Sequence, residues 1–340
     1  MAMNLRSRIG KLVQDRKDPE VECLEIFDLA TVAAERGWKY EEILSPTIQT
    51  CPGARALSED FLQWAENGKH LLKIHRDSRR GLAFSRHWAS LLHSVYRYPM
   101  DKVFRCALPG ASVLSYGGGI LSDRQEWVRE AFFISRPLRQ SQIPTKLPKV
   151  LEGKFISLLT IWGDRNLGHF FFDAMLRTAV FDDLENYKFL VPAQLHPWHR
   201  GLFEVAGIKP DQLVPIDNPF TRAEELHACH TSSSGSMPRR ELLLKFRDRA
   251  LKAAGAEQPP RRNRRIFVDR SGAQRRKLLN QKELEPILAE RGFELVRWEE
   301  HSIAEQIRIA SETEIMAGPH GTNLLNSLYC QPGAKLLEII

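Results

Sequence analysis

The chain of 340 residues is 43% hydrophobic, which is enough to bury one large core or, more comfortably, two domains. Its net charge of +7 favours an anionic partner and leaves nucleic acid, an acidic lipid surface and a phosphorylated small molecule open. The five cysteines are widely spread and form no CxxC pair, which disfavours a disulfide framework and a zinc site, and the chain has neither a signal-peptide pattern nor an 18-residue apolar run. We therefore expect a soluble protein of the cytoplasm.

Residues 1–40 are expected to form an N-terminal helical extension. Residues 1–20 are basic, and we expect them to fray or to pack on the surface. The alternative is contact with a membrane surface through this basic segment, which would place the protein peripherally at the inner membrane. Apolar residues recur at helical spacing over 21–34, and Gly37 is a stop signal.

Residues 41–236 form the first predicted α/β domain. Gly117, Gly118 and Gly119 follow an apolar strand, but the Walker lysine and the GxGxxG spacing are absent, so a hairpin is favoured over a phosphate-binding loop. Apolar periodicity predicts helices at 61–72, 88–96 and 198–206, strands at 155–161, 188–191, 212–216 and 225–230, and a linker at 231–238.

The segment after the strand at 155–161 carries the first candidate site. Asn166 is placed to cap a helix at 170–181. His169, Asp173 and Arg177 recur at four-residue spacing, so an imidazole, a carboxylate and a guanidinium share one helix face. A solvated charged stripe is the alternative. The phenylalanines that begin this helix leave little of it free for solvent, so we favour a functional site.

Residues 237–340 alternate strands and helices and form the second predicted domain, with a helix at 241–254 and strands at 266–268 and 293–298. The strand at 266–268 leads into a turn with Arg270 and Arg276. Guanidinium groups suit a diphosphate, because each can donate two hydrogen bonds to phosphate oxygens. A solvated basic loop and a nucleic-acid patch are the alternatives. No nucleic-acid-binding motif accompanies the charges, so we expect no nucleic-acid partner.

Two helices of this second domain carry capping signals. Asn280 with Glu283, and Ser302 with Glu305, match the spacing of a capping box. We interpret both pairs as structural.

The loop at 318–323, GPHGTN, follows a third strand. Its glycines let the backbone approach a ligand closely, and the helix after it directs N-terminal amides towards a phosphate. His320 alone is also compatible with a buried structural histidine. Taken with the loop, it favours contact with a diphosphate.

The motifs NLGHFFFD, RSGAQRRKLLN, HGTNLLN and the terminal LLE together resemble glycosyltransferase family 61, over residues 40–340 loosely and over 155–340 well. The family includes bacterial capsular-polysaccharide enzymes, to which this chain is similar, together with plant xylan transferases and animal O-linked N-acetylglucosaminyltransferases. The resemblance implies an α/β fold of the GT-B type, with two facing Rossmann-like domains and parallel sheets. Relatives continue through closing helices, so the resemblance also implies that the C-terminal end at Ile340 is truncated.

The resemblance implies an inverting transfer from a nucleoside-diphosphate sugar, most naturally a UDP-sugar, to a hydroxyl group of a glycan or polysaccharide. At position 323 the family usually has glycine, whereas this chain has asparagine, which tolerates left-handed backbone better than most residues. The resemblance assigns donor binding to Asn166, Arg270, Arg276, Asn280, His320, Gly321, Thr322, Asn323 and Glu338, with Glu338 suited to the ribose hydroxyls.

An inverting transfer needs a base for the acceptor hydroxyl and positive charge for the leaving nucleoside diphosphate. Asp173 is the first choice for the base and His169 the second. The chain has no DxD pair, so we expect a metal-independent enzyme without a cofactor, in which arginines replace the metal. The alternative is a non-catalytic or impaired GT-B-fold protein that binds a nucleotide or a glycan. A nucleic-acid-binding protein is a distant third.

Overall fold

The computed structural model describes residues 25–50, 97–115, 117–131, 150–233, 237–259, 261–273, 278 and 280–339. They belong to two compact units: the first comprises Met1–Glu41 and Phe104–Ile340, and the second comprises Glu42–Val103. The domain division predicted at residues 40 and 236 stays a prediction. The helices predicted at 61–72 and 88–96 lie outside the described residues.

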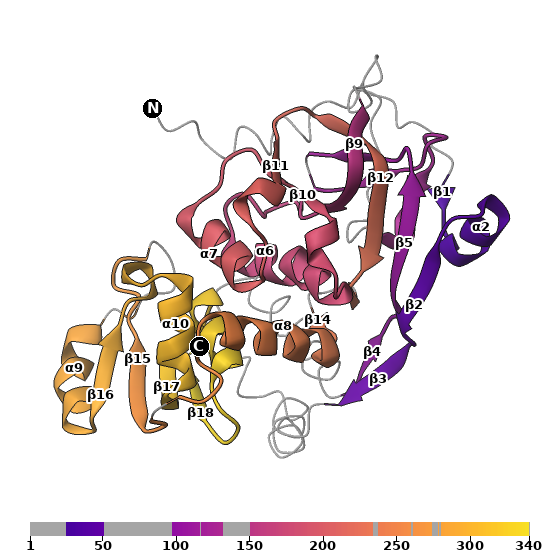
Figure 1. The fold of residues 1–340 in the computed structure, drawn as a ribbon. Coiled ribbons are helices and arrows are strands. Elements are labelled where there is room, and N and C mark those ends of the chain that lie inside the picture. Colours follow the sequence, from indigo (N-terminus) through magenta and orange to yellow (C-terminus); the bar gives the residue numbers. More distant parts are fainter. Residues whose placement is uncertain are drawn as a thin grey trace, which may run out of the picture. The chain divides into compact units, whose positions relative to one another are not determined.

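The larger sheet has the strand order β1-β8-β7-β6-β12-β9-β10-β11. Strand β5 pairs with β12, and β2 pairs with β5; Figure 1 labels β2, β5, β9 and β12 among these strands. Its long central strand, β12, pairs with β9 on one side and with β5 and β6 on the other. The strands are β1 (Glu25–Ile26), β2 (Tyr40–Leu44), β5 (Val103–Pro109), β6 (Ser112–Leu114), β7 (Ile120–Leu121), β8 (Trp127–Val128), β9 (Val150–Ser157), β10 (Lys188–Pro192), β11 (Leu213–Ile216) and β12 (Phe220–His230).

The direction of these strands corrects the expectation that the sheet of the first domain is parallel. β12, β9, β10 and β11 are parallel to one another, as predicted. However, β5 and β6 run antiparallel to β12, and β6, β7 and β8 are antiparallel neighbours. Short turns can join only antiparallel neighbours, and the glycine-rich turn between β6 and β7 is such a connection. The sheet is therefore mixed, and the predicted glycine hairpin is confirmed.

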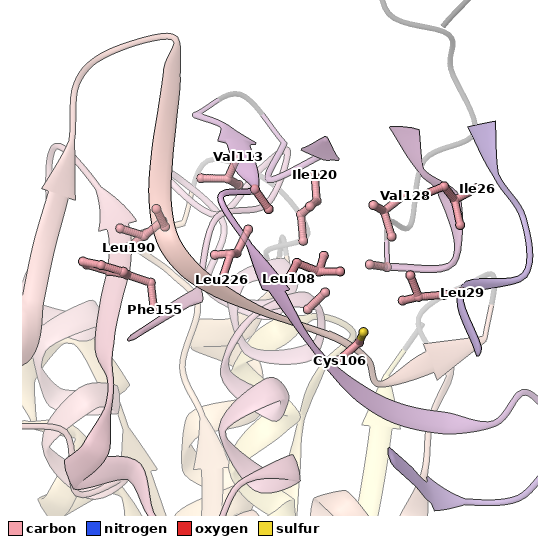
Figure 2. Packing of buried hydrophobic residues seen from close by; sticks show 14 of the residues in the cluster. Ile26, Leu29, Cys106, Leu108, Val113, Ile120, Val128, Phe155, Leu190 and Leu226 are labelled. Atoms are coloured by element: carbon pink, nitrogen blue, oxygen red, sulfur yellow. The ribbon is translucent and has the colours of Figure 1, made fainter. Parts of the chain in front are cut away.

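The first described helix, α2 (Leu29–Arg36), is shorter than the helix predicted at 21–34. Its start is set by Asp28, whose side chain accepts a hydrogen bond from the Thr31 amide, and β1 occupies the residues just before it. Gly37 ends the helix with φ +68°, as predicted. Leu29 and Ala33 are fully buried in the main apolar cluster, together with side chains from β1, β5, β8, β9 and β12 (Figure 2).

The remaining helices of this part connect or cover the parallel strands. The predicted helices at 198–206 and 241–254 are found with ends shifted by one residue, and Gly207, with φ +82°, follows the first. The helical segments are η2 (Arg129–Ala131), α6 (Leu167–Asp173), η4 (Met175–Val180), η5 (Leu184–Asn186), α7 (Pro197–Val205), η6 (Pro210–Gln212) and α8 (Arg240–Ala253).

The second sheet of the main unit is parallel throughout, in the order β16-β15-β17-β18, which confirms the alternating strand and helix pattern of the last quarter. The predicted linker at 231–238 contains a short hairpin of β13 (Ser232–Ser233) and β14 (Met237–Pro238). In the second compact unit, β3 (Thr47–Thr50) pairs antiparallel with β4 (Arg97–Met100). The other elements are β15 (Arg264–Val268), α9 (Gln281–Glu290), β16 (Phe293–Val296), η7 (Trp298–Glu300), α10 (Ile303–Ser311), β17 (Thr313–Pro319), η8 (Thr322–Tyr329) and β18 (Lys335–Ile339).

Helix α8 links the helices of the larger sheet to those of the smaller one. Arg249 donates hydrogen bonds to the carbonyl oxygens of Thr178 and Phe181 at the end of η4, at 3.2 and 3.1 Å. Arg247 donates to the carbonyl oxygens of Leu328 and Cys330 at the end of η8, at 2.9 and 3.1 Å. Because these two arginines donate to carbonyl oxygens at the C-terminal ends of η4 and η8, one helix fixes both segments.

In the part of the chain that the structure describes, no helix is both long and apolar enough to cross a membrane.

Candidate functional site

The histidine and aspartate predicted on one helix face do contact each other. Asn166 caps α6 by accepting a hydrogen bond from the His169 amide at 3.2 Å. His169 Nδ1 lies 3.0 Å from Asp173 Oδ2. The Asp173 side chain is 3% exposed and that of His169 is 32% exposed. When Asp173 is ionised its carboxylate can only accept hydrogen bonds, so Nδ1 then donates and the lone pair of the neutral imidazole is on Nε2.

Asp173 is shielded from solvent. Burial raises the pKa of its carboxyl group, and the hydrogen bond and charge of His169 oppose this shift. Its second oxygen, Oδ1, has no hydrogen-bond partner among the described residues. The carboxylate therefore acts mainly on the imidazole beside it.

The third member of the predicted stripe, Arg177, has a different position. The helix predicted at 170–181 is wrong, because α6 ends at Asp173 and a 3-10 segment, η4, follows after Ala174. Arg177 donates hydrogen bonds to the carbonyl oxygens of Ser157 and Leu159, at 2.7 and 3.2 Å, where β9 ends. Burial lowers the pKa of its guanidinium. Arg177 therefore fixes the strand end from which the site begins.

The loop between β9 and α6 is held by two histidines that sequence reasoning missed. His199 is fully buried, and its Nε2 lies 2.7 Å from the carbonyl oxygen of Gly163. Burial lowers the pKa of His199 to about 4, so it is neutral at pH 7 and donates this hydrogen bond. His196 Nε2 lies 3.0 Å from the carbonyl oxygen of Asp164. The only signal in the sequence is the pair of histidines around Trp198 in the motif HPWH.

Asp269 organises the loop after β15, which sequence reasoning also missed. Its Oδ1 accepts hydrogen bonds from the Ser271 amide at 2.7 Å and from Gln281 at 2.8 Å, and its Oδ2 accepts one from Arg297 at 2.7 Å. Burial alone would raise the pKa of Asp269, but these hydrogen bonds together lower it to about 2. The carboxylate therefore stays charged and fixes the backbone beside Arg270.

Arg270 is held over the GPHGTN loop. Its NH1 donates a hydrogen bond to Asn323 Oδ1 at 2.6 Å. Gly321 has φ +150°, and a Cβ there would lie 2.6 Å from the same NH1, so only glycine lets the guanidinium approach the backbone. Asn323 is held in turn, because Nδ2 donates to the Pro319 carbonyl at 3.2 Å and Trp298 Nε1 donates to the Asn323 carbonyl at 2.8 Å. This arrangement places a cation from the loop after β15 against the glycine backbone of the loop after β17.

The carboxyl ends of β17 and β18 carry the next pair of predicted residues. His320 Nδ1 lies 2.6 Å from Glu338 Oε1, and the two side chains are 40% and 39% exposed. The His320 amide also donates to the carbonyl of Ile339 at 2.7 Å. Glu338 therefore orients the imidazole and leaves its Nε2 edge accessible.

Two residues predicted to bind the donor, Asn280 and Arg276, are not part of the contacts described above. Asn280 begins α9 but makes no capping hydrogen bond with its side chain, so the predicted capping box with Glu283 is wrong. The physical reason is its backbone, at φ −107° and ψ 29°, which is not the extended conformation of an N-cap residue. The capping box of Ser302 and Glu305 is confirmed. Arg276 lies outside the described residues.

Helix α6 and segment η8 meet directly. A Cβ at Gly168 would lie 2.9 Å from Thr322 Oγ1, so the Thr322 side chain packs closely against the backbone of α6 there. Farther along, a Cβ at Gly201 of α7 would lie 2.6 Å from Ile303 of α10. We call the first contact and its surroundings the α6–η8 junction, and it consists of Asn166, Gly168, His169, Asp173, Arg270, Gly321, Thr322 and Asn323.

Within the described ranges, no group of three or more histidine, cysteine, aspartate or glutamate side chains is arranged to hold a metal ion. The predicted metal independence stays a prediction.

The family described as Glycosyltransferase 61 matches residues 167–337, which begin at α6 and end in β18. The matched range contains every described residue of the α6–η8 junction except Asn166. No curated protein matches the chain.

Proposed function

The chain belongs to glycosyltransferase family 61 and is a glycosyltransferase, and from this premise we propose that it transfers a sugar from a nucleoside-diphosphate sugar, preferably a UDP-sugar, to a hydroxyl group of a glycan. The observation that carries the proposal is the α6–η8 junction, where His169 and Asp173 on one side meet the loop that holds Arg270 on the other. A base and an anion-binding loop are the two groups that such a transfer requires.

We propose His169 as the base, ahead of Asp173. Asp173 is 3% exposed and bonded to His169, whereas His169 is 32% exposed and keeps Nε2 free. A general base has to reach the proton that it removes, so exposure favours the imidazole. Asp173 then acts as a positioning residue, which keeps the proton on Nδ1 and stabilises the imidazolium that forms.

The proposed step inverts the configuration of the sugar. The acceptor oxygen forms a bond to the anomeric carbon while the bond from that carbon to the diphosphate oxygen breaks. The electron pair of the broken bond stays on the diphosphate, and the proton of the acceptor hydroxyl moves to His169 Nε2. Arg270, His320 and the backbone amides at the start of η8 would stabilise the charge on the leaving group.

Further features of the proposal rest on the resemblance of the motifs. We infer a GT-B arrangement, a metal-independent reaction, and a role in bacterial capsular-polysaccharide synthesis. The all-parallel sheet β16-β15-β17-β18, with Arg270 and His320 after two adjacent strands, supports the donor side of this inference, because ligands of parallel sheets bind beyond the carboxyl ends of the strands.

The experiment is calorimetry of UDP, GDP and CMP with the full chain, followed by a transfer assay with a panel of nucleotide sugars. We expect UDP to bind, Arg270→Ala to weaken it roughly 10-fold or more, and the control Arg262→Ala, which removes an equal charge before β15, to leave it unchanged. His169→Ala should lower the transfer rate by roughly 100- to 10,000-fold and keep UDP binding. Absence of binding for all three nucleotides would refute the proposal, and binding without turnover on any donor would identify the non-catalytic alternative.

A further inference from the structure

We propose that Trp162 is the stacking platform for the acceptor sugar, so that a pyranose ring lies on its indole with one hydroxyl group directed at His169. The proposal rests on the proposed function, because it takes His169 as the base. Trp162 lies in the loop between β9 and α6 and is 44% exposed. Its ring centroid is 4.6 Å from that of His169, with the ring planes at 51°.

The backbone of Trp162 is held in place by its own loop, and its indole packs against His169. The carbonyl oxygen of Trp162 accepts hydrogen bonds from the amides of Arg165 and Asn166, at 3.2 and 2.9 Å. Asn166 in turn caps the helix that carries His169. The position of the indole is therefore coupled to that of the base, which a randomly exposed tryptophan would not be.

The next residue in the loop, Gly163, is also constrained. Its carbonyl oxygen lies 2.7 Å from the buried His199, and a Cβ at this position would lie 2.6 Å from Thr160 and 3.1 Å from Phe170. His199, Thr160 and Phe170 therefore pack against this loop, and the loop cannot move so as to bury Trp162 in the core. The large apolar ring of Trp162 is therefore presented to solvent on a fixed backbone beside His169.

The chemistry of the ring indicates its ligand. Trp162 presents a flat apolar face, and a pyranose has an apolar face of C–H groups with hydroxyl groups around its edge. Stacking on the indole would bury the C–H face and direct the hydroxyl edge of such a sugar towards the neighbouring imidazole of His169. The acceptor is thus inferred to present a pyranose at the reacting end.

A nucleotide base also stacks on aromatic rings, and it is the competing occupant. The position of the cations favours the sugar. Arg270 and His320, the proposed diphosphate contacts, belong to the loops after β15 and β17, whereas Trp162 and His169 belong to the loop and helix after β9. The proposed base must face the acceptor, so the ring in contact with it belongs to the acceptor side.

The test uses the seven tryptophan indole N–H signals of the full chain in a proton–nitrogen correlation spectrum. Trp162→Phe identifies the Trp162 signal by its loss. The probes are methyl β-glucopyranoside, methyl β-galactopyranoside and methyl β-xylopyranoside, with mannitol as an open-chain polyol control. We expect at least one pyranoside, but not mannitol, to shift the Trp162 signal selectively.

Variants give the second readout. Trp162→Ala should weaken binding of the responding pyranoside about 10-fold, Trp162→Phe should weaken it less, and both should bind UDP as wild type does. Phe27→Ala is the matched control, because Phe27 is an aromatic residue with 67% exposure just before α2. The absence of a Trp162 shift with all three pyranosides overturns the inference, and so does a loss of UDP affinity in Trp162→Ala with unchanged pyranoside binding. Failure of wild type to bind UDP, GDP and CMP refutes the proposed function separately.

Discussion

Asn323 helps to hold Arg270 in place, and Asn323→Asp is the sharpest test of the proposed donor site. The substitution keeps the size of the side chain and the acceptor oxygen that lies 2.6 Å from Arg270 NH1. It adds one negative charge beside the guanidinium. If this loop binds a diphosphate, the new carboxylate both pairs with Arg270 and repels the ligand.

The expected magnitude follows from Coulomb's law. Two unit charges about 5 Å apart interact by roughly 1 to 3 kcal/mol when the effective dielectric constant lies between about 80 and 20. Asn323 and Arg270 are both partly exposed, so this range applies. It corresponds to a UDP dissociation constant raised by roughly 5- to 150-fold. Protein stability should not fall, because the variant gains an ion pair with Arg270.

The assay is calorimetry of UDP at low and high ionic strength, together with thermal unfolding of the ligand-free protein. The loss of affinity should shrink as salt screens the added charge. Asn263→Asp is the matched control, since it adds the same charge before β15 whereas Arg270 follows that strand. UDP binding by Asn323→Asp as tight as that of wild type, at low salt, would show that Arg270 and Asn323 do not contact the diphosphate.

Three further changes test the junction and its supports. Asp173→Asn should lower the transfer rate roughly 100-fold with unchanged UDP binding, because an amide no longer holds the proton on His169 Nδ1. Burial raises the pKa of Asp173, so the charge of this carboxylate opposes folding above its ordinary pKa. Urea unfolding at pH 7 should therefore find the variant no less stable than wild type. The pKa of Asp269 is lowered to about 2, so its stabilising contribution of about 2 kcal/mol is present above pH 4 and is lost as pH falls towards 2, and urea unfolding of Asp269→Asn should lack this part of the acid dependence. Gly168→Ala should destabilise the protein by about 1 to 3 kcal/mol, because its Cβ would lie 2.9 Å from Thr322 Oγ1. Adding Thr322→Ala to this variant should restore part of the melting temperature. A Gly168→Ala variant as stable as wild type would contradict the contact.

The elements that sequence reasoning predicted best are those with strong local signals. The helix α8 and the strand β10 lie within one residue of their predicted positions, because their apolar periodicity is regular. The capping box at Ser302 was confirmed because all its atoms lie within one turn. The helix predicted at 170–181 failed, because Arg177 is drawn to carbonyl oxygens of residues about 20 positions earlier, at the end of β9.

The candidate site shows the same contrast between local sequence signals and contacts that are distant in the chain. Its motif residues were visible in the sequence because glycine, histidine and arginine cluster directly after predicted strands. Their partners were not visible: Arg270 contacts Asn323 at a separation of 53 residues, and His199 contacts Gly163 at a separation of 36. No short sequence pattern predicts contacts between residues this far apart in the chain.

The sequence by itself determined that the chain alternates strands and helices and that its polar motifs lie at the carboxyl ends of strands. It also carried the marks of the family, since these are short and contiguous. Only the tertiary structure decided that Asp173 is buried against His169, that Asp269 organises the loop beside Arg270, and that Trp162 stays exposed next to His169. The physical reason is that burial and hydrogen-bond partners depend on which strand ends the parallel sheets bring together, and that arrangement is set by packing across the whole unit.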